Sequence, residues 1–239
     1  MSDTPAPARA GRWPDVPVVP LPWPAGPVLD LVGLALVAVG ALVLRVLQTS
    51  PLWLDEALSA NIASLPIGDI PSALEHDGHP PLYYVVLHVW QDVVGAGDVA
   101  VRLLSGLVGL ALVPLAATAA GRLGGRRAAW AAALLVALNP FVIRYATEAR
   151  MYEIVMVLAI GGWLTADAAL RRIDPPRLVL LAVLTGALLW THYWGIWLTA
   201  ASGLGLVVRA ALAHRGGDTE RRSVSLAVLG ALTVGCLTF

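Results

Sequence analysis

Two adjacent carboxylates, Asp55 and Glu56, follow the first long apolar run of the chain, within Trp53-Leu54-Asp55-Glu56. A charge at the centre of a bilayer costs about 2.5–3.5 kcal/mol on insertion scales, so the pair either marks where water begins or has a chemical role. A carboxylate within hydrogen-bond reach of a hydroxyl can remove its proton. Neighbouring residues on a helix point about 100° apart, so one acid can face a substrate while the other caps the helix. An ordinary acidic helix start explains the pair equally well.

A second group of polar side chains occupies His76-Asp77-Gly78-His79-Pro80-Pro81-Leu82-Tyr83-Tyr84. The glycine suits a tight turn, and the two prolines suit a helix start. Histidine and aspartate are ordinary metal ligands, so the segment leaves a divalent metal open, although the His76-x-x-His79 spacing is weak evidence for one. The two tyrosines also suit an aromatic belt at a membrane surface.

Two further segments carry groups that suit a phosphate. In the stretch from Asn139 to Glu153, the side chains of Glu148, Arg150 and Tyr152 recur at alternate positions. The planar fork of an arginine matches phosphate oxygens, although an arginine that reaches lipid headgroups or pairs with a glutamate explains the pattern too. In Trp190-Thr191-His192-Tyr193-Trp194, His192 could reach a phosphate or a sugar hydroxyl, while the aromatic residues are typical interface anchors.

The elements that must position these groups are strongly apolar. Of the 239 residues, 58% are hydrophobic and 13% are charged, and the mean hydropathy is +0.74. Soluble domains carry about 25% charged residues, so the composition indicates an integral membrane protein. A net charge of zero argues against a nucleic-acid partner. A single cysteine, Cys236, excludes a disulfide framework and a cysteine-based metal site.

Membrane-spanning helices need about 20 apolar residues each. The apolar runs predict spans at 28–48, 102–121, 127–143, 153–170, 177–191, 195–213 and 223–239. The run 81–94 is shorter and carries His88, Gln91 and Asp92, so we predict a juxtamembrane helix there. The proline-rich residues 1–27 are predicted to form a disordered cytoplasmic tail.

The arginines predict the orientation of the chain, because cytoplasmic loops are enriched in them. With a cytoplasmic N-terminus and with 81–94 outside the membrane, four arginines fall on the outer side or its borders: Arg45, Arg102, Arg144 and Arg150. The other twelve fall inside, and the bias collapses if 81–94 crosses. The loop 49–101, with Asp55 and Glu56, is therefore predicted to lie outside. The inner loops contain no phosphate-binding glycine motif, which argues against a nucleotide-driven reaction.

Several of these motifs occur in an order that resembles a known family. The series comprises Trp53-Leu54-Asp55-Glu56, His79-Pro80-Pro81-Leu82-Tyr83-Tyr84, Arg102-Leu103-Leu104-Ser105, Asn139-Pro140-Phe141 and Glu148-Ala149-Arg150-Met151-Tyr152. It resembles the GT-C membrane glycosyltransferases, in the glycosyltransferase family 39-like branch that includes protein O-mannosyltransferases and the lipid A aminoarabinose transferase. It is most similar to actinobacterial mannosyltransferases of that branch, and the resemblance covers roughly residues 28–200.

The resemblance implies an all-α integral membrane fold over 28–239, with about seven transmembrane helices and a long first external loop, 49–101, that bears juxtamembrane helices. It implies transfer of a mannose-like sugar from a polyprenyl-phosphate-linked donor to a hydroxyl on a glycan, lipid or protein of the cell envelope. It implies that Asp55 is the catalytic base and that Glu56 supports it. One direct displacement would invert the anomeric carbon, and no cofactor is expected when arginines stabilise the leaving phosphate.

The remaining motif residues take roles from the same resemblance. Candidates for the donor and its phosphate are His79, Arg102, Arg144, Glu148, Arg150, Tyr152 and His192. Candidates on the acceptor side are Asp77, Tyr83 and Tyr84. The chain lacks the metal-binding DxD of the oligosaccharyltransferase relatives, so a metal is not implied. It also stops at Phe239 within an apolar run, and because family members are usually longer, we expect an N-terminal portion of a longer enzyme.

Two other functions remain open from the sequence: a transporter or flippase for lipid-linked substrates, and a non-catalytic membrane scaffold. Transporters place ionisable residues near the bilayer midplane and often contain inverted repeats. Here the acids within the apolar spans, Asp30 and Asp167, lie near span ends, and no internal repeat is found.

Overall fold

The computed structural model describes residues 27–46 and 50–239, so the predicted disordered tail lies outside the described residues except for Pro27. All regular structure in these two ranges is helical. The elements are α1 (Pro27–Val46), α2 (Leu54–Ala63), the 3-10 helix η1 (Ile67–Asp69), α3 (Ile70–Asp77), α4 (Leu82–Val94), α5 (Asp98–Leu138), α6 (Pro140–Ala146), α7 (Tyr152–Arg171), α8 (Pro175–Thr191), α9 (Gly195–Arg215) and α10 (Thr219–Cys236). The all-α prediction is confirmed for the described residues.

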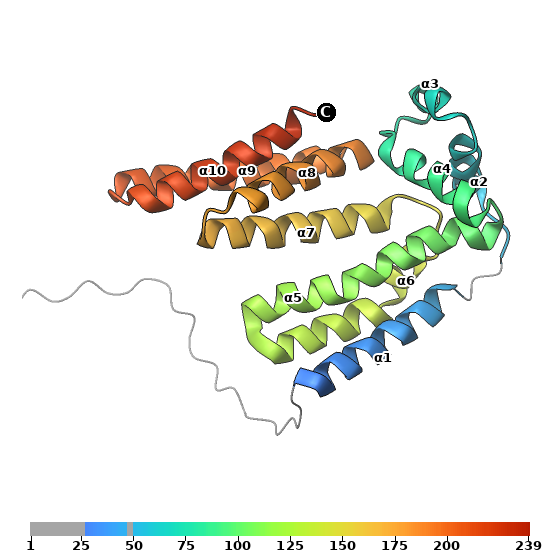
Figure 1. The fold of residues 1–239 in the computed structure, drawn as a ribbon, viewed down its shortest axis with the longest axis horizontal. Helices are drawn as coiled ribbons and strands as arrows, with labels where there is room; N and C mark the ends of the chain where they lie inside the picture. The colour runs from blue at the N-terminus through green and yellow to red at the C-terminus, as the bar shows by residue number, and fades with distance from the viewer. Residues whose placement is uncertain (1–26, 47–49) are drawn as a thin grey trace, which may run out of the picture.

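Helix α5 folds back on itself, as Figure 1 shows. The reversal occurs at Gly125, whose φ of 71° lies in a region that side chains with a Cβ rarely adopt. The two arms correspond to the predicted spans 102–121 and 127–143. The second arm ends at Leu138 rather than 143, because Pro140 cannot continue a helix and the side chain of Asn139 caps the new helix α6. The Asn139 Oδ1 accepts a hydrogen bond of 2.8 Å from the Phe141 N–H.

The predicted helix at 81–94 is present as α4, and it begins directly after Pro80-Pro81. Three polar side chains fix it in place. His88 Nδ1 lies 2.8 Å from the Ala63 carbonyl oxygen, Gln91 Nε2 donates to the Ala60 carbonyl at 3.2 Å, and Trp90 Nε1 donates to the Ala100 carbonyl at 2.7 Å. The described part of the predicted loop, residues 50–101, is therefore folded against the start of α5, and its juxtamembrane position stays a prediction.

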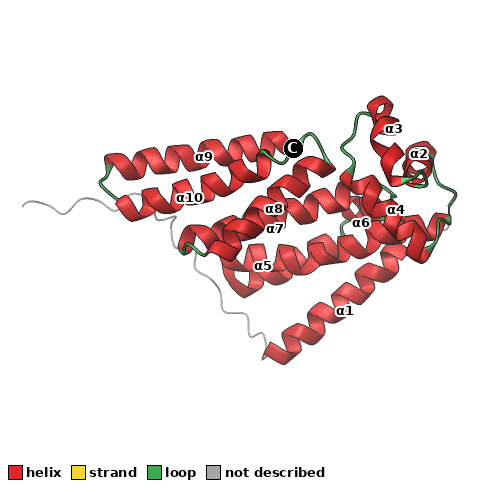
Figure 2. Cartoon of the chain, turned by 45° about the horizontal axis from the view of Figure 1, so that its top comes forward, coloured by secondary structure: helices red, strands yellow, loops and turns green. Residues whose placement is uncertain are grey.

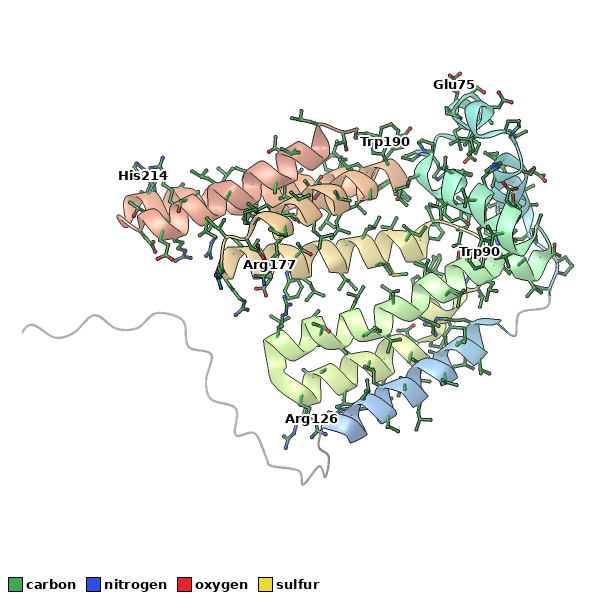
Figure 3. The ribbon with its side chains drawn as sticks, viewed as in Figure 1. Glu75, Trp90, Arg126, Arg177, Trp190 and His214 are labelled. Atoms are coloured by element: carbon green, nitrogen blue, oxygen red, sulfur yellow. The ribbon has the colours of Figure 1, made fainter. Side chains whose placement is uncertain are left out.

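The long helices lie side by side, and α2, α3 and α4 gather at one end of them (Figures 1 and 2). Helix α5 packs between α1 and α7, α7 packs on α8, and α10 packs on both α8 and α9. Figure 3 places Glu75 and Trp90 at the end that carries α3 and α4, and it places Arg126, Arg177 and His214 at the opposite end. The arginine-rich connections thus share one end of the bundle, here called the basic end. The membrane side that it faces remains a prediction.

Three helices of the described residues are long and apolar enough to cross a membrane: α5, α7 and α9. Helix α8 is apolar but has only 17 residues. Large hydrophobic side chains are exposed along these helices, including Trp197 at 69% and Leu204 at 65%. Exposed apolar area on this scale fits contact with lipid, which supports a membrane protein. The seven-span arrangement stays a prediction.

Ion pairs join helices at the basic end. Arg126 at the α5 reversal makes two hydrogen bonds, of 2.7 and 2.6 Å, to the Asp30 carboxylate on α1. Arg122 on the first arm of α5 donates to Asp167 on α7 at 3.1 Å, and Arg171 binds the same carboxylate. These contacts attach α1 and α7 to opposite sides of α5.

The contact between α8 and α10 depends on a glycine. A Cβ at Gly235 would lie 2.5 Å from the Ala182 carbonyl oxygen and 2.6 Å from the Thr185 Cβ. We expect Gly235→Ala to lower the free energy of unfolding by about 1–3 kcal/mol, because the two helices must move apart. Thermal unfolding in detergent micelles measures the effect.

Gly230→Ala on the same helix is the matched control, because a Cβ there meets nothing within 4 Å. Alanine is favoured over glycine in a helix by up to about 1 kcal/mol, so this variant should be neutral or slightly stabilised. Equal unfolding temperatures for the two variants would contradict the close contact.

Candidate active site

Glu56 is fully buried, and its carboxylate joins three separate parts of the chain. Arg102 on α5 donates to it from Nε at 2.8 Å and from Nη2 at 2.5 Å. The backbone N–H groups of Ala149 and Trp53 donate to it at 2.8 and 3.2 Å. Burial raises the pKa of Glu56, but the hydrogen bonds from Arg102 and from the two N–H groups outweigh it and hold the pKa below its ordinary value. The carboxylate therefore fixes α2 against α5 and against the segment after α6.

Arg102 is engaged beyond this pair. Its Nη1 donates to the Ser50 carbonyl oxygen, and its Nη2 donates to the Pro51 carbonyl oxygen at 3.0 Å. The side chain is only 6% exposed. Arg102 was predicted as a phosphate ligand, but in the structure its side chain binds Glu56 and the backbone just before α2. It therefore holds α2 in place.

Asp55 points away from its neighbour, as expected for consecutive helical residues. It is partly exposed, and among the described residues no hydrogen bond or ion pair involves its carboxylate. Its backbone carbonyl oxygen accepts a hydrogen bond of 2.8 Å from the Ser59 hydroxyl one turn later. Asp55 is therefore the carboxylate of the pair that can meet a substrate.

Arg150 lies directly beside Asp55, between α6 and α7, and is 6% exposed. Its Nη1 is 3.4 Å from the Ser59 hydroxyl and 3.5 Å from the Asp55 carbonyl oxygen, and its Cζ lies 5.9 Å from the centre of the Tyr152 ring. Its buried Nε has no hydrogen-bond partner, and no described carboxylate lies within ion-pair distance of the guanidinium. Burial lowers the pKa of Arg150, but Tyr152, Tyr84 and Asp55 outweigh it, so the side chain stays charged.

A third group of side chains lies next to Arg150. Asp77 Oδ2 accepts a hydrogen bond of 2.6 Å from the Tyr84 hydroxyl and lies 3.0 Å from His79 Nδ1. When His79 Nδ1 carries the proton and donates it to Asp77, its Nε2 is left as an acceptor. Burial, reinforced by the neighbouring Asp77 carboxylate, raises the pKa of Tyr84, so its hydroxyl stays protonated and donates.

His192 connects this group to Arg150. Its ring is 5.9 Å from the His79 ring in an edge-to-face arrangement and 6.5 Å from the Tyr152 ring. Burial lowers the pKa of His192, and the neighbouring Arg150 guanidinium lowers it further. The imidazole is therefore neutral near pH 7, with Nδ1 accepting a hydrogen bond of 3.2 Å from the Trp194 N–H.

The predicted residues thus fall into two sets. One set is linked to Arg150: Asp55 through its backbone carbonyl oxygen, Tyr152 through its ring, and His192 through Tyr152. His79 joins this set through His192, and Asp77 and Tyr84 join it through His79. Arg144 lies apart with an exposed side chain, and it forms an ion pair of 3.1 Å with Glu148 one turn away. Tyr83 is fully buried in the apolar core between α2, α4 and α5.

Some polar residues near the site were not predicted. Ser59 is fully buried against Arg150. It follows Asp55 by four residues on α2, so helical periodicity places the two on the same face and could have identified Ser59. Glu153 in the first turn of α7 is also fully buried, and both its carboxylate oxygens lack a hydrogen-bond partner. It packs against Gly109, on the same side of the bundle as the buried Arg45. No sequence pattern distinguishes Glu153 from an ordinary acid at a helix start.

No cluster of three or more His, Cys, Asp or Glu side chains that could hold a metal occurs among the described residues. Comparison with protein-family models, with curated proteins and with solved structures gives no match. The function of the chain is therefore inferred from the geometry of the site.

Replacement of Glu56 tests the structural role of its carboxylate. We expect Glu56→Gln to lower the free energy of unfolding by about 3–5 kcal/mol, because Arg102 is left buried without its partner. Glu75→Gln, at an exposed position on α3, should change stability little. Thermal unfolding in detergent compares the two, and equal effects would contradict the role assigned to Glu56.

The same pair predicts a pH dependence. Because the folded-state pKa of Glu56 is lowered, its contribution to stability is complete above the ordinary glutamate pKa of 4.5 and is lost as the pH falls through the folded pKa. The wild-type protein should therefore lose more stability on acidification below about pH 4.5 than Glu56→Gln. Unfolding curves between pH 3 and 7 measure this difference, and parallel profiles would contradict it.

Proposed function

We propose that this chain is a GT-C-like membrane glycosyltransferase with about seven transmembrane helices, active at the extracytoplasmic face. It transfers a mannose-like sugar from a polyprenyl-phosphate-linked donor to a hydroxyl acceptor of the cell envelope. The observation that carries the proposal is the buried cation of Arg150, which has no carboxylate partner among the described residues and lies 3.5 Å from the backbone carbonyl oxygen of Asp55.

A buried charge is costly unless it is paired, so the environment of Arg150 favours an anionic ligand. The phosphate of a lipid-linked sugar supplies two features of such a ligand: the negative charge, and oxygens that match a guanidinium. The neutral His192 and the Tyr152 hydroxyl are further groups that can donate hydrogen bonds to phosphate or sugar. As the bond from sugar to phosphate breaks, charge grows on the phosphate, and a preorganised cation stabilises it.

Asp55 is the proposed base. The acceptor hydroxyl gives its proton to the Asp55 carboxylate while its oxygen bonds to the anomeric carbon, and the bond from that carbon to the phosphate oxygen breaks. The departing lipid phosphate keeps the electron pair and is held by Arg150. A single displacement of this kind inverts the anomeric configuration.

The remaining polar groups position the reactants. Asp77 fixes the ring of His79 through Nδ1, which leaves Nε2 to accept a hydrogen bond from a substrate hydroxyl. The Glu56–Arg102 pair holds α2 against the segment that carries Arg150. This pair therefore sets the separation of base and cation without contacting the substrate.

Asp55→Asn tests the proposed base. We expect transfer from a polyprenyl-phosphate sugar to fall by about 10²–10⁴-fold, because an amide cannot accept the hydroxyl proton. Binding of the donor should change little. Asp69→Asn, at an exposed position of the same external loop, is the matched control. The measurement is transfer of radiolabelled sugar by the full-length protein in proteoliposomes.

A transporter or a scaffold for lipid-linked substrates predicts that Asp55→Asn is silent in that assay. Undiminished transfer by Asp55→Asn would therefore remove Asp55 as the base. A product that retains the anomeric configuration, assigned by NMR, would remove the single-displacement mechanism.

Arg150→Gln tests the phosphate site separately. Loss of one preorganised group at a developing charge lowers the maximal rate by about 10²–10³-fold in comparable sites, and we expect a fall in that range. Arg215→Gln, at an exposed position at the end of α9, is the control. If Arg150→Gln raises the KM for the acceptor and leaves the maximal rate unchanged, Arg150 does not act on the leaving phosphate.

A further inference from the structure

A cavity lies between α7, α8 and α9, separate from the side chains grouped around Arg150. Its volume is about 360 Å³, within the range of about 300–1,000 Å³ typical of ligand pockets. No residue grouped around Arg150 lines it. Its wall is mainly apolar and includes Leu158, Trp163, Leu184, Leu188, Leu198 and Leu206.

Two hydroxyl groups in the wall of this cavity already form hydrogen bonds within the protein. The Thr185 hydroxyl donates to the Leu181 carbonyl oxygen of its own helix at 2.8 Å. The Thr199 hydroxyl donates to the Gly195 and Ile196 carbonyl oxygens at 3.1 and 2.9 Å. The third hydroxyl of the lining, on Ser202, is on an exposed residue. An apolar chain in the cavity therefore leaves the hydroxyls of Thr185 and Thr199 with the hydrogen bonds they already make.

One mouth of the cavity carries charge. Asp167 and Arg209 line it, in the last turns of α7 and α9, which end at Arg171 and Arg215. The Asp167 carboxylate is already bound by Arg122 and Arg171, at 3.1 and 3.2 Å. Arg209 donates from Nε to the Ser225 hydroxyl at 3.1 Å, and no described carboxylate lies within ion-pair distance of it. Arg209 is therefore the lining cation without a carboxylate partner among the described residues, and an anionic group is favoured beside it.

We propose that this cavity binds one anionic phospholipid, with an acyl chain between α7, α8 and α9 and the phosphate on Arg209. Basic pockets between membrane helices bind anionic headgroups, and a guanidinium pairs with phosphate oxygens. The isoprenoid tail of a donor bound at Arg150 enters from the opposite end and brings no anion to Arg209. Charge complementarity at the mouth therefore selects the phospholipid as the occupant.

Lipid retention during purification tests the proposal. The full-length protein is washed in detergent with equal amounts of phosphatidylglycerol and phosphatidylcholine, and bound lipid is counted by native mass spectrometry. We expect one phosphatidylglycerol per chain, preferred by about fivefold or more over phosphatidylcholine, which is the effect expected of one arginine near a headgroup with a net negative charge. Arg209→Gln should abolish the preference, and Arg215→Gln, outside the cavity, should keep it.

Blocking the cavity gives an independent test. A Cβ at Gly162, on the cavity wall, meets nothing within 4 Å, so Gly162→Leu is accommodated and directs its side chain into the space. This variant should lose the bound phospholipid. Gly230→Leu is the control, because its Cβ is equally unobstructed and Gly230 does not line the cavity.

Three results would overturn the proposal. Equal retention of the two phospholipids would exclude recognition of the anion. Retention by Gly162→Leu equal to that of Gly230→Leu would place the lipid elsewhere. Displacement of the phospholipid by a polyprenyl phosphate, to the same extent in the wild type and in Arg209→Gln, would assign the cavity to an isoprenoid tail.

Discussion

A single carboxylate without solvent contact, that of Glu56, holds together the end of the molecule that carries α2, α3 and α4. Glu56 receives hydrogen bonds from α5, from the backbone after α6 and from the residue before α2. Each of these parts belongs to a different stretch of sequence, and each carries or adjoins a residue of the candidate site. Because a buried carboxylate is stable only when its partners stay in place, the pair with Arg102 couples the positions of Asp55 and Arg150. The chemistry proposed for these two residues depends on that coupling.

Asp55 and Glu56, the two acids in the first turn of α2, therefore have different roles because their side chains point in different directions. Glu56 turns inward to Arg102, whereas Asp55 is partly exposed and its backbone lies beside Arg150. The same division appears among the arginines: Arg102 is surrounded by acceptors of the protein, and Arg150 contacts only distant ones. This lack of close acceptors distinguishes Arg150, a candidate ligand-binding residue, from Arg102, which belongs to a structural ion pair.

The positions of the long helices were predicted well, because the apolar runs are long and the breaks between them fall at Gly, Pro and Asn. The sequence also placed α4 as a short helix, since His88, Gln91 and Asp92 interrupt its apolar face. Within the site, periodicity and charge did not reveal which of Asp55 and Glu56 faces inward, because that depends on Arg102, 46 positions away. Glu153 and Arg45 could not be predicted as buried either, since their burial arises from contacts between α1, α5 and α7 that no local pattern records.

The two ends of the bundle are joined by different kinds of contact. At the end that carries α2, α3 and α4 the Glu56–Arg102 pair is buried. At the basic end Arg126, Asp30, Arg171 and Asp167 keep roughly a quarter or more of their side chains in contact with solvent. Exposed ion pairs contribute little and are screened by salt, while buried ones are not. Added salt therefore weakens the ion pairs that set the spacing of α1, α5 and α7 at the basic end. It acts much less on the buried Glu56–Arg102 pair, which holds α2 near Arg150.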